Sequence, residues 1–221
     1  MQKQIKIINS STTIPIGKIV CVGRNYVEHI HELGNEVPEK PVVFLKPNSS
    51  IIYSGDEIIY PNYSNDMHHE IELLLLIGKT VKDASLEDSE NAIIGYGVGL
   101  DMTLRDVQDV LKKKGHPWTI AKCFDTSAVL SDFILKENYK ITFEEELILK
   151  VNDEVRQREK LNKMIFKPAE LVRYLSSIMT LDYGDIIFTG TPKGVGKVNK
   201  GDSLWGSLDN FVNINCSVKT N

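Results

Sequence analysis

Apolar residues occur in short runs separated by polar turns, a pattern that predicts a fold made mainly of β-strands. The runs at residues 18–23, 65–77 and 93–100 have the apolar content of buried strands, and we interpret residues 65–77 as one continuous strand. Further strands are expected at residues 4–9, at 41–45, at 186–188, around Trp205 and at 211–218.

Apolar positions three and four residues apart predict helices. One is expected from Thr103 as its cap to Lys114, where Gly115 ends it, with a buried stripe of Leu104, Val107, Val110 and Leu111. A second begins at Lys167-Pro168 and buries Leu171, Leu175, Ile178 and Met179. A third runs from after Tyr26 to about Leu33 and stops at Gly34-Asn35.

Turn residues complete the predicted order of elements. Turns are expected at residues 14–17, at 54–56 as a hairpin, and at Asn152-Asp153 in a second hairpin. Residues 78–89 form a polar connection with a short helix. Residues 23–40 combine the third helix with a connector rich in proline and charge, which suits a mobile lid.

Length and composition narrow the class of protein. With 221 residues, 42% of them apolar and 25% charged, one globular domain spanning residues 1–221 is expected. The net charge of −4, without a basic stripe, argues against nucleic acid as a partner. No apolar run approaches the roughly 20 residues that span a membrane, and no signal peptide is predicted. Three scattered cysteines indicate free thiols in a reducing cytoplasm.

Acidic residues lie where two of the apolar strands meet polar sequence. Glu70 and Glu72 alternate on one strand, so they point the same way about 6.5–7 Å apart. Asp101 ends the strand at residues 93–100, just where a helix is expected to begin. Buried like charges repel each other and lose water, and a hard divalent cation such as Mg²⁺ removes both penalties. Two solvated glutamates on a half-exposed strand are the alternative.

Basic residues in the flanking segments extend this candidate site. His29 and Glu32 are three apart on one helix, so a carboxylate is able to hold a general-base histidine; a surface pair is the alternative. Lys122 lies in an apolar stretch and either extends to solvent or pairs with buried anions. Gln108 lies off the apolar stripe of its helix, toward a pocket.

The loop at residues 189–197 is rich in glycine and threonine but is not a P-loop. If Gly196-Lys197 ended a P-loop motif, its first glycine would stand at position 191, which is occupied by Thr191. The residue after the lysine would be Ser or Thr, but it is Val198. The alternative is a turn whose backbone N–H groups and threonine hydroxyls bind a ligand carboxylate.

Taken together, these stretches resemble the fumarylacetoacetate hydrolase family, and in particular its small acylpyruvase and oxaloacetate decarboxylase branch. The matching segments follow in order over nearly the whole chain. They are Val22-Gly23-Arg24-Asn25-Tyr26, Phe44-Leu45-Lys46-Pro47, His68-His69-Glu70-Ile71-Glu72, Leu100-Asp101-Met102-Thr103, Arg105-Asp106-Val107-Gln108, Lys112-Lys113-Lys114-Gly115, Pro117-Trp118-Thr119, Ala121-Lys122 and the loop at residues 189–196.

The resemblance implies an α+β, mainly β fold, a mixed β-sandwich roll with a few peripheral helices, assembled as a homodimer. It implies Mg²⁺ or Mn²⁺ on Glu70, Glu72 and Asp101, and a lid at residues 23–40 that carries His29 and Glu32. It assigns Lys122 as the active-site lysine. Substrate contacts are implied for Arg24, Lys46, Gln108 and Thr191. His68 shares a strand face with the glutamates, but the family does not use it as a ligand.

The chemistry expected of such a site is cleavage of C–C bonds in small anionic 2-oxo acids through a metal-stabilised enolate. Acylpyruvate hydrolysis and oxaloacetate decarboxylation are the two leading reactions. An isomerase, hydratase or decarboxylase of 2-hydroxy-dienoates on the same scaffold is one alternative. A non-catalytic protein that binds divalent cations is the other.

Overall fold

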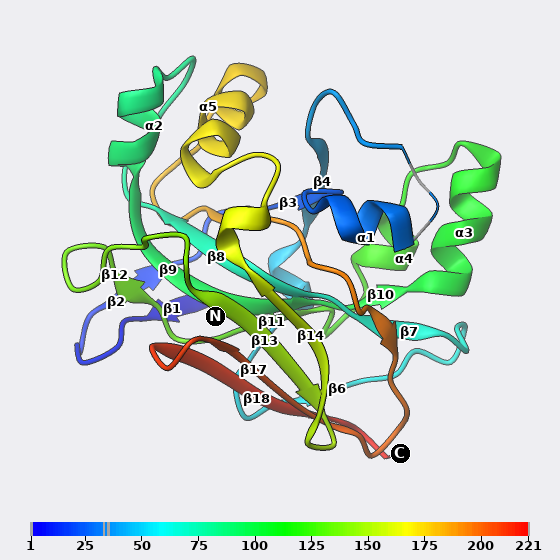
Figure 1. The fold of residues 1–221 in the computed structure, drawn as a ribbon. Helices are drawn as coiled ribbons and strands as arrows, with labels where there is room; N and C mark the ends of the chain where they lie inside the picture. The colour runs from blue at the N-terminus through cyan, green and yellow to red at the C-terminus, as the bar shows by residue number, and fades with distance from the viewer. Residues whose placement is uncertain (1, 33, 35, 221) are drawn as a thin grey trace.

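Two β-sheets make up most of the molecule, and helices cover its periphery (Figure 1). The structure, a computed structural model, describes residues 2–32, 34 and 36–220. The prediction of an α+β, mainly β fold of the mixed sandwich-roll type is confirmed.

The larger sheet has eight strands and mixes parallel with antiparallel pairs. Its order is β4-β3-β15-β8-β9-β11-β5, with β12 paired to β9. The strands are β3 (Ile19–Gly23), β4 (Val42–Lys46), β5 (Ile51–Tyr53), β8 (Ile71–Ile77), β9 (Ile93–Asp101), β11 (Ala128–Leu130), β12 (Ile134–Leu135) and β15 (Ile186–Phe188).

The second sheet has the order β14-β13-β17-β18-β6. Its strands are β6 (Glu57–Ile58), β13 (Glu146–Val151), β14 (Glu154–Lys160), β17 (Ser203–Leu208) and β18 (Val212–Val218). Two small sheets complete the fold: β1 (Gln4–Lys6) with β2 (Thr13–Pro15), and the order β10-β7-β16 from β7 (Met67–His69), β10 (Thr103–Leu104) and β16 (Gly196–Lys197).

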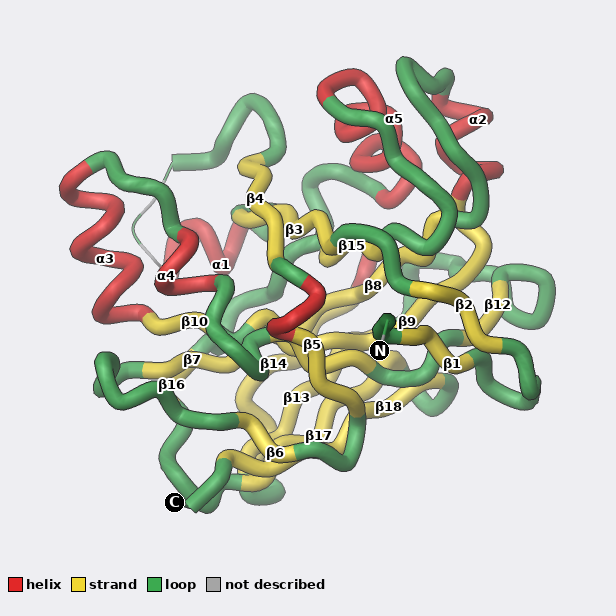
Figure 2. Tube along the Cα trace, turned by 180° about the vertical axis from the view of Figure 1, so that it is seen from behind, coloured by secondary structure: helices red, strands yellow, loops and turns green. Residues whose placement is uncertain are grey.

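The helices gather in two groups, which Figure 2 shows from behind. On one side lie α2 (Leu86–Ala92) and α5 (Pro168–Ile178), and on the other lie α1 (Val27–Glu32), α3 (Arg105–Lys114) and α4 (Thr119–Lys122). Short 3₁₀ turns occur at Asn48–Ser50 and Leu161–Lys163. None of the described helices has the length and apolar character needed to cross a bilayer.

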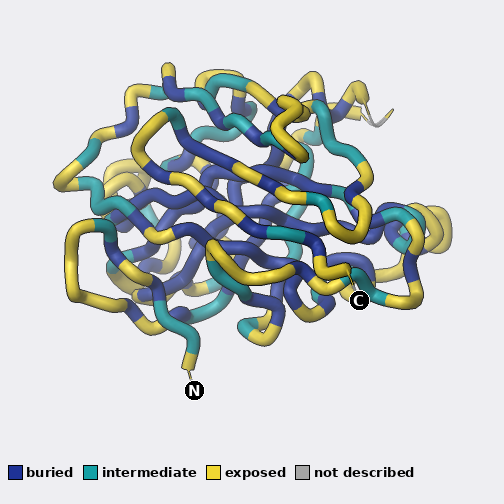
Figure 3. The backbone as a smooth tube through the Cα atoms, turned by 90° about the horizontal axis from the view of Figure 1, so that it is seen from below, coloured by how far each residue is buried: buried dark blue, intermediate teal, exposed yellow. Residues whose placement is uncertain are grey.

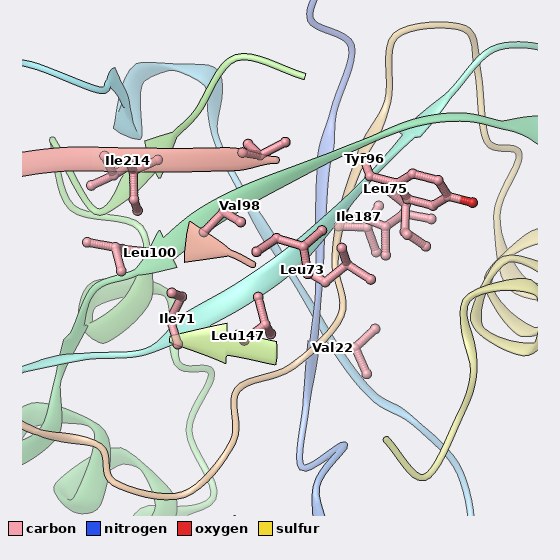
Figure 4. Close-up of a cluster of buried hydrophobic side chains, with 14 of the residues drawn as sticks. Val22, Ile71, Leu73, Leu75, Tyr96, Val98, Leu100, Leu147, Ile187 and Ile214 are labelled. Atoms are coloured by element: carbon pink, nitrogen blue, oxygen red, sulfur yellow. The ribbon is translucent and has the colours of Figure 1, made fainter. Parts of the chain in front are cut away.

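Strand β8 is buried along both faces, which explains its uninterrupted aliphatic sequence. Leu73 and Leu75 belong to one core cluster with residues of the second sheet such as Leu147 and Ile214, and Figure 4 shows Leu75 beside Tyr96 and Ile187. The alternate residues Leu74 and Leu76 point to the other face and belong to a second cluster. This cluster contains residues of the β1–β2 segment, of β15 and of the segment before β12: Ile5, Ile7, Ile14, Phe133, Ile186 and Phe188. Seen from below, the buried segments run through the middle of the molecule and the exposed ones around it (Figure 3).

Several predicted elements agree with the structure. Asn152 and Asp153 both have positive φ, 49° and 65°, and join β13 to β14 in a tight hairpin. Gly115 ends α3 in the left-handed conformation, with φ 66°. All three cysteines are free thiols. The strands predicted at residues 18–23, 41–45 and 186–188 correspond to β3, β4 and β15.

Other predictions about elements are wrong. Residues 13–15 form strand β2 because they pair with β1, so the turn predicted at 14–17 is incorrect. Residues 54–56 form the predicted turn, in which the Asp56 N–H donates to the Tyr53 carbonyl at 3.0 Å. The turn does not close a hairpin, since β5 pairs with β11 in one sheet and β6 pairs with β18 in the other. The predicted end near Leu33 and the stop at Asn35 lie outside the described residues.

The two long helices also differ in detail from their predictions. Thr103 is not a cap, because residues 103–104 form strand β10 and α3 begins at Arg105. Val110 and Ile178 are about half exposed, at 50% and 51%, so neither belongs to the buried stripe assigned to it. Each lies on the solvent side of a helix whose opposite side reaches the core.

Asn25 joins three segments that surround the lid helix. Its buried side-chain amide donates to the carbonyls of Thr189 at 2.7 Å and Phe166 at 3.0 Å, and its oxygen accepts from the Phe166 N–H at 2.7 Å. The base of α1 is thereby tied to the strand end at residue 188 and to the start of α5.

Replacing Asn25 with alanine leaves these buried backbone groups without partners. We expect Asn25→Ala to lower the free energy of unfolding by about 2–4 kcal/mol in urea titrations. The control is Asn213→Ala on the exposed side of β18, for which we expect a change in the free energy of unfolding within about 0.5 kcal/mol. Equal stability of the two variants would contradict this assignment.

Candidate active site

Three buried carboxylates converge at one end of β8 and β9. Ligand oxygens of Glu70, Glu72 and Asp101 all lie within 4.8 Å of one another. The predicted single strand at residues 65–77 is in fact interrupted, since Glu70 separates β7 from β8. At this break the Asp101 N–H donates to the Glu70 carbonyl at 2.9 Å, which fixes the two acids side by side.

Three cationic side chains surround these acids. Lys122 contacts Asp101 at 2.6 Å and Glu70 at 2.8 Å, and Arg105 forms a close ion pair with Glu70. Burial opposes ionisation of Glu70, but Lys122 and Arg105 outweigh it and hold its pKa below its usual range. Lys46 lies 2.8 Å from Asp101 and also donates to Ser127.

Glu72 differs from the other two acids. It is 2% exposed, and no ion pair joins it to a cation among the described residues. Its oxygen accepts a hydrogen bond from the Gly190 N–H at 2.6 Å. Burial, followed by the charges of Asp101 and Glu70, raises its pKa well above the usual value.

Gly190 reaches this position because it is glycine. Its φ is +98°, and a Cβ there would lie 2.7 Å from the Cβ of Asn25. The backbone of the loop after β15 therefore comes close enough to bond Glu72.

These residues fit a hard divalent cation. The site offers three carboxylate groups, the donor type that Mg²⁺ and Mn²⁺ prefer, and one of them lacks a cationic partner. A bound divalent ion would relieve the mutual repulsion of the acids. The metal set expected from the sequence is therefore assembled in space.

The lid helix brings its histidine to the same place. His29 is buried on α1, and its Nδ1 lies 3.2 Å from Glu32 Oε2. Glu32 in turn accepts from the Gly194 N–H at 3.0 Å. Since a carboxylate only accepts, Nδ1 of the neutral ring carries the proton and Nε2 carries the lone pair. The surface-pair alternative is wrong for His29, which faces the acids.

A cavity of about 40 Å³ lies between the lid and the acids. It holds about one water molecule, so α1 covers the site closely in this structure. Its lining includes these predicted residues: Arg24, His29, Glu70, Glu72, Asp101, Gln108, Lys122 and Thr191. A cleft of about 830 Å³ adjoins it and shares Phe44, Trp118 and Lys122 with it.

The remaining predicted residues differ in whether they reach the cavity. Arg24 has a left-handed backbone, with φ 59°, where β3 leads into the lid. Gln108 is buried and accepts from Arg105 at 2.6 Å. Lys46 does not line the small cavity; Asp101 and Ser127 engage its ammonium group, so it supports an acid. His68 lies outside the carboxylate cluster and pairs with Asp66 at 3.0 Å.

Sequence reasoning missed two cationic residues of the cavity. Arg105 begins α3 and lies three positions before Gln108, so the two share a face of the helix. Because Gln108 was expected at the pocket, this spacing would have predicted Arg105 there as well. Lys112 belongs to a run interpreted as solvated charge, but its ammonium lies 5.8 Å from the Trp118 ring and lines the cavity. The rotation of α3 against Trp118 decides this, and no local pattern shows it.

Comparison with known proteins agrees with the site. The family model described as "Fumarylacetoacetate (FAA) hydrolase C-terminal" matches residues 18–219. A bovine (Bos taurus) protein named oxaloacetate tautomerase FAHD1, mitochondrial, is 43% identical over 201 residues, 91% of each chain. A Dictyostelium discoideum oxaloacetate decarboxylase, mitochondrial, is 47% identical over 188 residues, 85% of this chain and 86% of that protein.

A solved structure is also close in fold. Fumarylpyruvate hydrolase from Pseudomonas aeruginosa, in complex with Mn²⁺ and pyruvate, superimposes with a TM-score of 0.95 and 36% identity. The match covers 100% of this chain and 97% of that one. Both sheets and the lid segment therefore have counterparts in an enzyme that binds a divalent cation.

A cation held by the three acids stabilises the folded protein by mass action. At Mn²⁺ concentrations about 100 times Kd, we expect the wild-type melting temperature to rise by about 5 °C or more. Asp101→Asn removes one charged ligand and should abolish most of this rise, whereas exposed Asp132→Asn should retain it. An unchanged Mn²⁺ effect in Asp101→Asn would exclude this site. Differential scanning calorimetry with and without EDTA measures both.

Proposed function

This chain belongs to the fumarylacetoacetate hydrolase family, and we propose that it cleaves C–C bonds of small anionic 2-oxo acids, by acylpyruvate hydrolysis, oxaloacetate decarboxylation or both. The observation that carries the proposal is the convergence of Glu70, Glu72 and Asp101 beneath a histidine on the lid. The expectation of an enzyme, a metal-dependent hydrolase or lyase acting on C–C bonds, is confirmed by the relatives.

Charge in the cavity favours an anionic substrate. Arg24, Arg105, Lys112 and Lys122 line it together with the three acids. Four positive charges and a divalent cation against three carboxylates leave a net charge of about +3, ready for one or two substrate carboxylates. Lys112 is suited to the far end of a dicarboxylic acid, because it lines the cavity while its ion pair is with Asp109 and not with one of the metal acids.

Mg²⁺ or Mn²⁺ is the proposed cofactor. When bound, such a cation supplies a Lewis acid that polarises a keto oxygen and stabilises enolate charge. The Mn²⁺ of the Pseudomonas aeruginosa protein supports the choice of a divalent ion.

The residues of this chain supply the remaining steps of hydrolysis. Neutral His29 takes a proton from water through Nε2, and the resulting hydroxide adds to the distal carbonyl of an acylpyruvate. The bond between that carbon and the methylene carbon then breaks, and the electron pair forms pyruvate enolate. A proton on the methylene carbon completes pyruvate. Lys122 and Arg105 balance the developing negative charge.

Decarboxylation needs no attacking water. In oxaloacetate the bond to the distal carboxylate breaks, CO₂ leaves, and the electron pair again forms pyruvate enolate, which takes up one proton. Because no nucleophile is required, His29 contributes less to this reaction than to hydrolysis.

Keto–enol conversion of oxaloacetate is a second candidate, favoured by the name of the bovine relative. It needs a base that removes a proton from the carbon next to the keto group and returns it to oxygen. His29 is placed for this task above the acids. Isomerisation of 2-hydroxy-dienoates would use the same groups. The relatives speak against the non-catalytic alternative.

A homodimer and a cytoplasmic location are further parts of this proposal. Strand β4 is an edge of the larger sheet, and its Leu45 is 48% exposed beside the 830 Å³ cleft. An open apolar edge of this kind suits a contact between two copies. Sedimentation velocity tests the dimer.

A substrate panel tests the reaction. We expect pyruvate release from an acylpyruvate, from oxaloacetate or from both, with a loss of at least about 100-fold on EDTA treatment and recovery with Mg²⁺ or Mn²⁺. Enol oxaloacetate, followed by its ultraviolet absorbance, and a 2-hydroxy-dienoate complete the panel. Turnover that EDTA leaves intact would refute the metal-dependent reaction.

The lid histidine predicts a pH profile. Burial lowers the pKa of His29 below its ordinary value of 6.5, while Glu70 and Glu32 raise it and Arg105 lowers it further. The neutral base is thus present at pH 7, and kcat/KM for hydrolysis falls only as pH drops through this lowered pKa. Glu32→Gln removes a group that raises the pKa, so this acid limb should move to lower pH.

His29→Gln should reduce hydrolysis by about 100-fold or more and decarboxylation far less. His31→Gln, on the exposed side of the same helix, is the matched control and should keep both rates. Equal losses in the two reactions for His29→Gln would mean that the helix acts only as a cover.

A further inference from the structure

Gln157 is a buried polar residue that the proposed reaction does not use. It lies on β14, in the sheet opposite the one that carries Glu72 and Asp101, and is 1% exposed. Its side chain nevertheless reaches the active-site loop after β15. Buried polar groups are almost always hydrogen-bonded, so both ends of this amide are expected to have partners.

The two ends of the amide bond different parts of the site. Oε1 lies 3.1 Å from the backbone N–H of Ile71, beside the strand break at Glu70, and 3.1 Å from His69 Nδ1. Nε2 lies 2.8 Å from Thr191 Oγ1 and 2.8 Å from the Pro192 carbonyl. Gln157 therefore links the metal-binding strand to the loop that lines the cavity.

Backbone groups fix the direction of this amide. The Ile71 N–H only donates, so it must face the amide oxygen. The Pro192 carbonyl only accepts, so it must face the NH₂ group. The exchange of nitrogen and oxygen that leaves many glutamines ambiguous would break both bonds here.

This direction has a consequence for Thr191. Its oxygen accepts a hydrogen bond from Gln157 Nε2, so its own O–H is not directed at Gln157. In the part of the chain that the structure describes, no hydrogen bond uses this hydroxyl as a donor. Thr191 is buried at 3% exposure and lines the cavity with the acids, so a donor remains available there.

We propose that Gln157 is a positioning residue, which sets the Thr191 hydroxyl as a hydrogen-bond donor to an anionic oxygen of the bound 2-oxo acid. The proposal rests on the proposed function and on the substrate contact that the family resemblance implies for Thr191, which lines the cavity. It also gives the second sheet a part in substrate binding, through one side chain.

Replacing the hydrogen-bond donor of residue 157 by an acceptor tests the proposal. Gln157→Glu keeps the length of the side chain and still accepts from Ile71, but it offers Thr191 an acceptor in place of a donor. The threonine hydroxyl should then donate to Glu and turn away from the substrate. We expect kcat/KM for the preferred substrate, and the affinity for pyruvate in the presence of Mn²⁺, to fall about 10- to 100-fold, as for a lost hydrogen bond to a charged acceptor.

A double-mutant cycle with Thr191→Val shows whether the effect passes through the hydroxyl. Thr191→Val alone should cause a loss of the same size, and the double variant should be no worse than Thr191→Val. Losses that multiply in the double variant would overturn the proposal, as would an unchanged kcat/KM in Gln157→Glu.

A third variant separates this role from a purely structural one. Gln157→Met has a similar length without donor or acceptor, so it leaves Thr191 free to donate. It should lower the melting temperature at least as much as Gln157→Glu while retaining more activity and tighter pyruvate binding. If activity instead follows melting temperature through both variants, the role is structural and the proposal fails.

The control is Gln4→Glu in the β1–β2 hairpin, for which wild-type kcat/KM is expected. The wild-type protein distinguishes a failure of the Gln157 role from a failure of the proposed function. If it neither turns over the substrate panel nor binds pyruvate with Mn²⁺, the proposed function falls, and with it the ligand assigned to Thr191. If it does both and the cycle is additive, only the role of Gln157 falls.

Discussion

The burial of three carboxylates within 4.8 Å of one another is the constraint on which the rest of this structure depends. Each acid loses water and repels the other two, so the cluster is unfavourable unless positive charge is brought to it. Lys46, Lys122 and Arg105 come from three separate elements and engage Asp101 and Glu70. Glu72 is left with a backbone N–H, and a divalent cation is the natural complement to that arrangement.

The sandwich makes such a cluster tolerable. Strand β8 is packed on both faces, so the backbone that carries Glu72 is held by the apolar core on either side, and the break at Glu70 turns that acid toward Asp101. Helix α1 covers the open side of the cluster. The Gly194 N–H donates to Glu32, the partner of His29, and the Gly190 N–H donates to Glu72, so one loop holds both carboxylates in place.

Local patterns predicted the elements whose environment is uniform along their length. The aliphatic run of β8, the helix at Pro168 and the hairpin at Asn152-Asp153 were readable for this reason. The acids and Lys122 were found because charged residues are costly in apolar surroundings, and His29 because Glu32 follows it by three positions on a helix. The family resemblance placed them together. Local patterns could not predict which strands pair with each other. Only three residues separate β5 from β6, yet the two strands join different sheets.

The part of the site that escaped prediction depends on contacts between distant segments. Lys112 was predicted to be solvated because its neighbours are lysines, but its ammonium group lies beside the Trp118 ring and lines the cavity. Gln157 sits in a polar strand of the opposite sheet, 34 positions before the threonine that it bonds. Neither role exists until the two sheets and α3 have packed.

A crystal structure of the protein soaked with Mn²⁺, with anomalous scattering used to locate the ion, tests the central claim most directly. We expect one strong peak within coordination distance of Glu70, Glu72 and Asp101 together. A peak elsewhere, or one that contacts a single acid of the three, would contradict it.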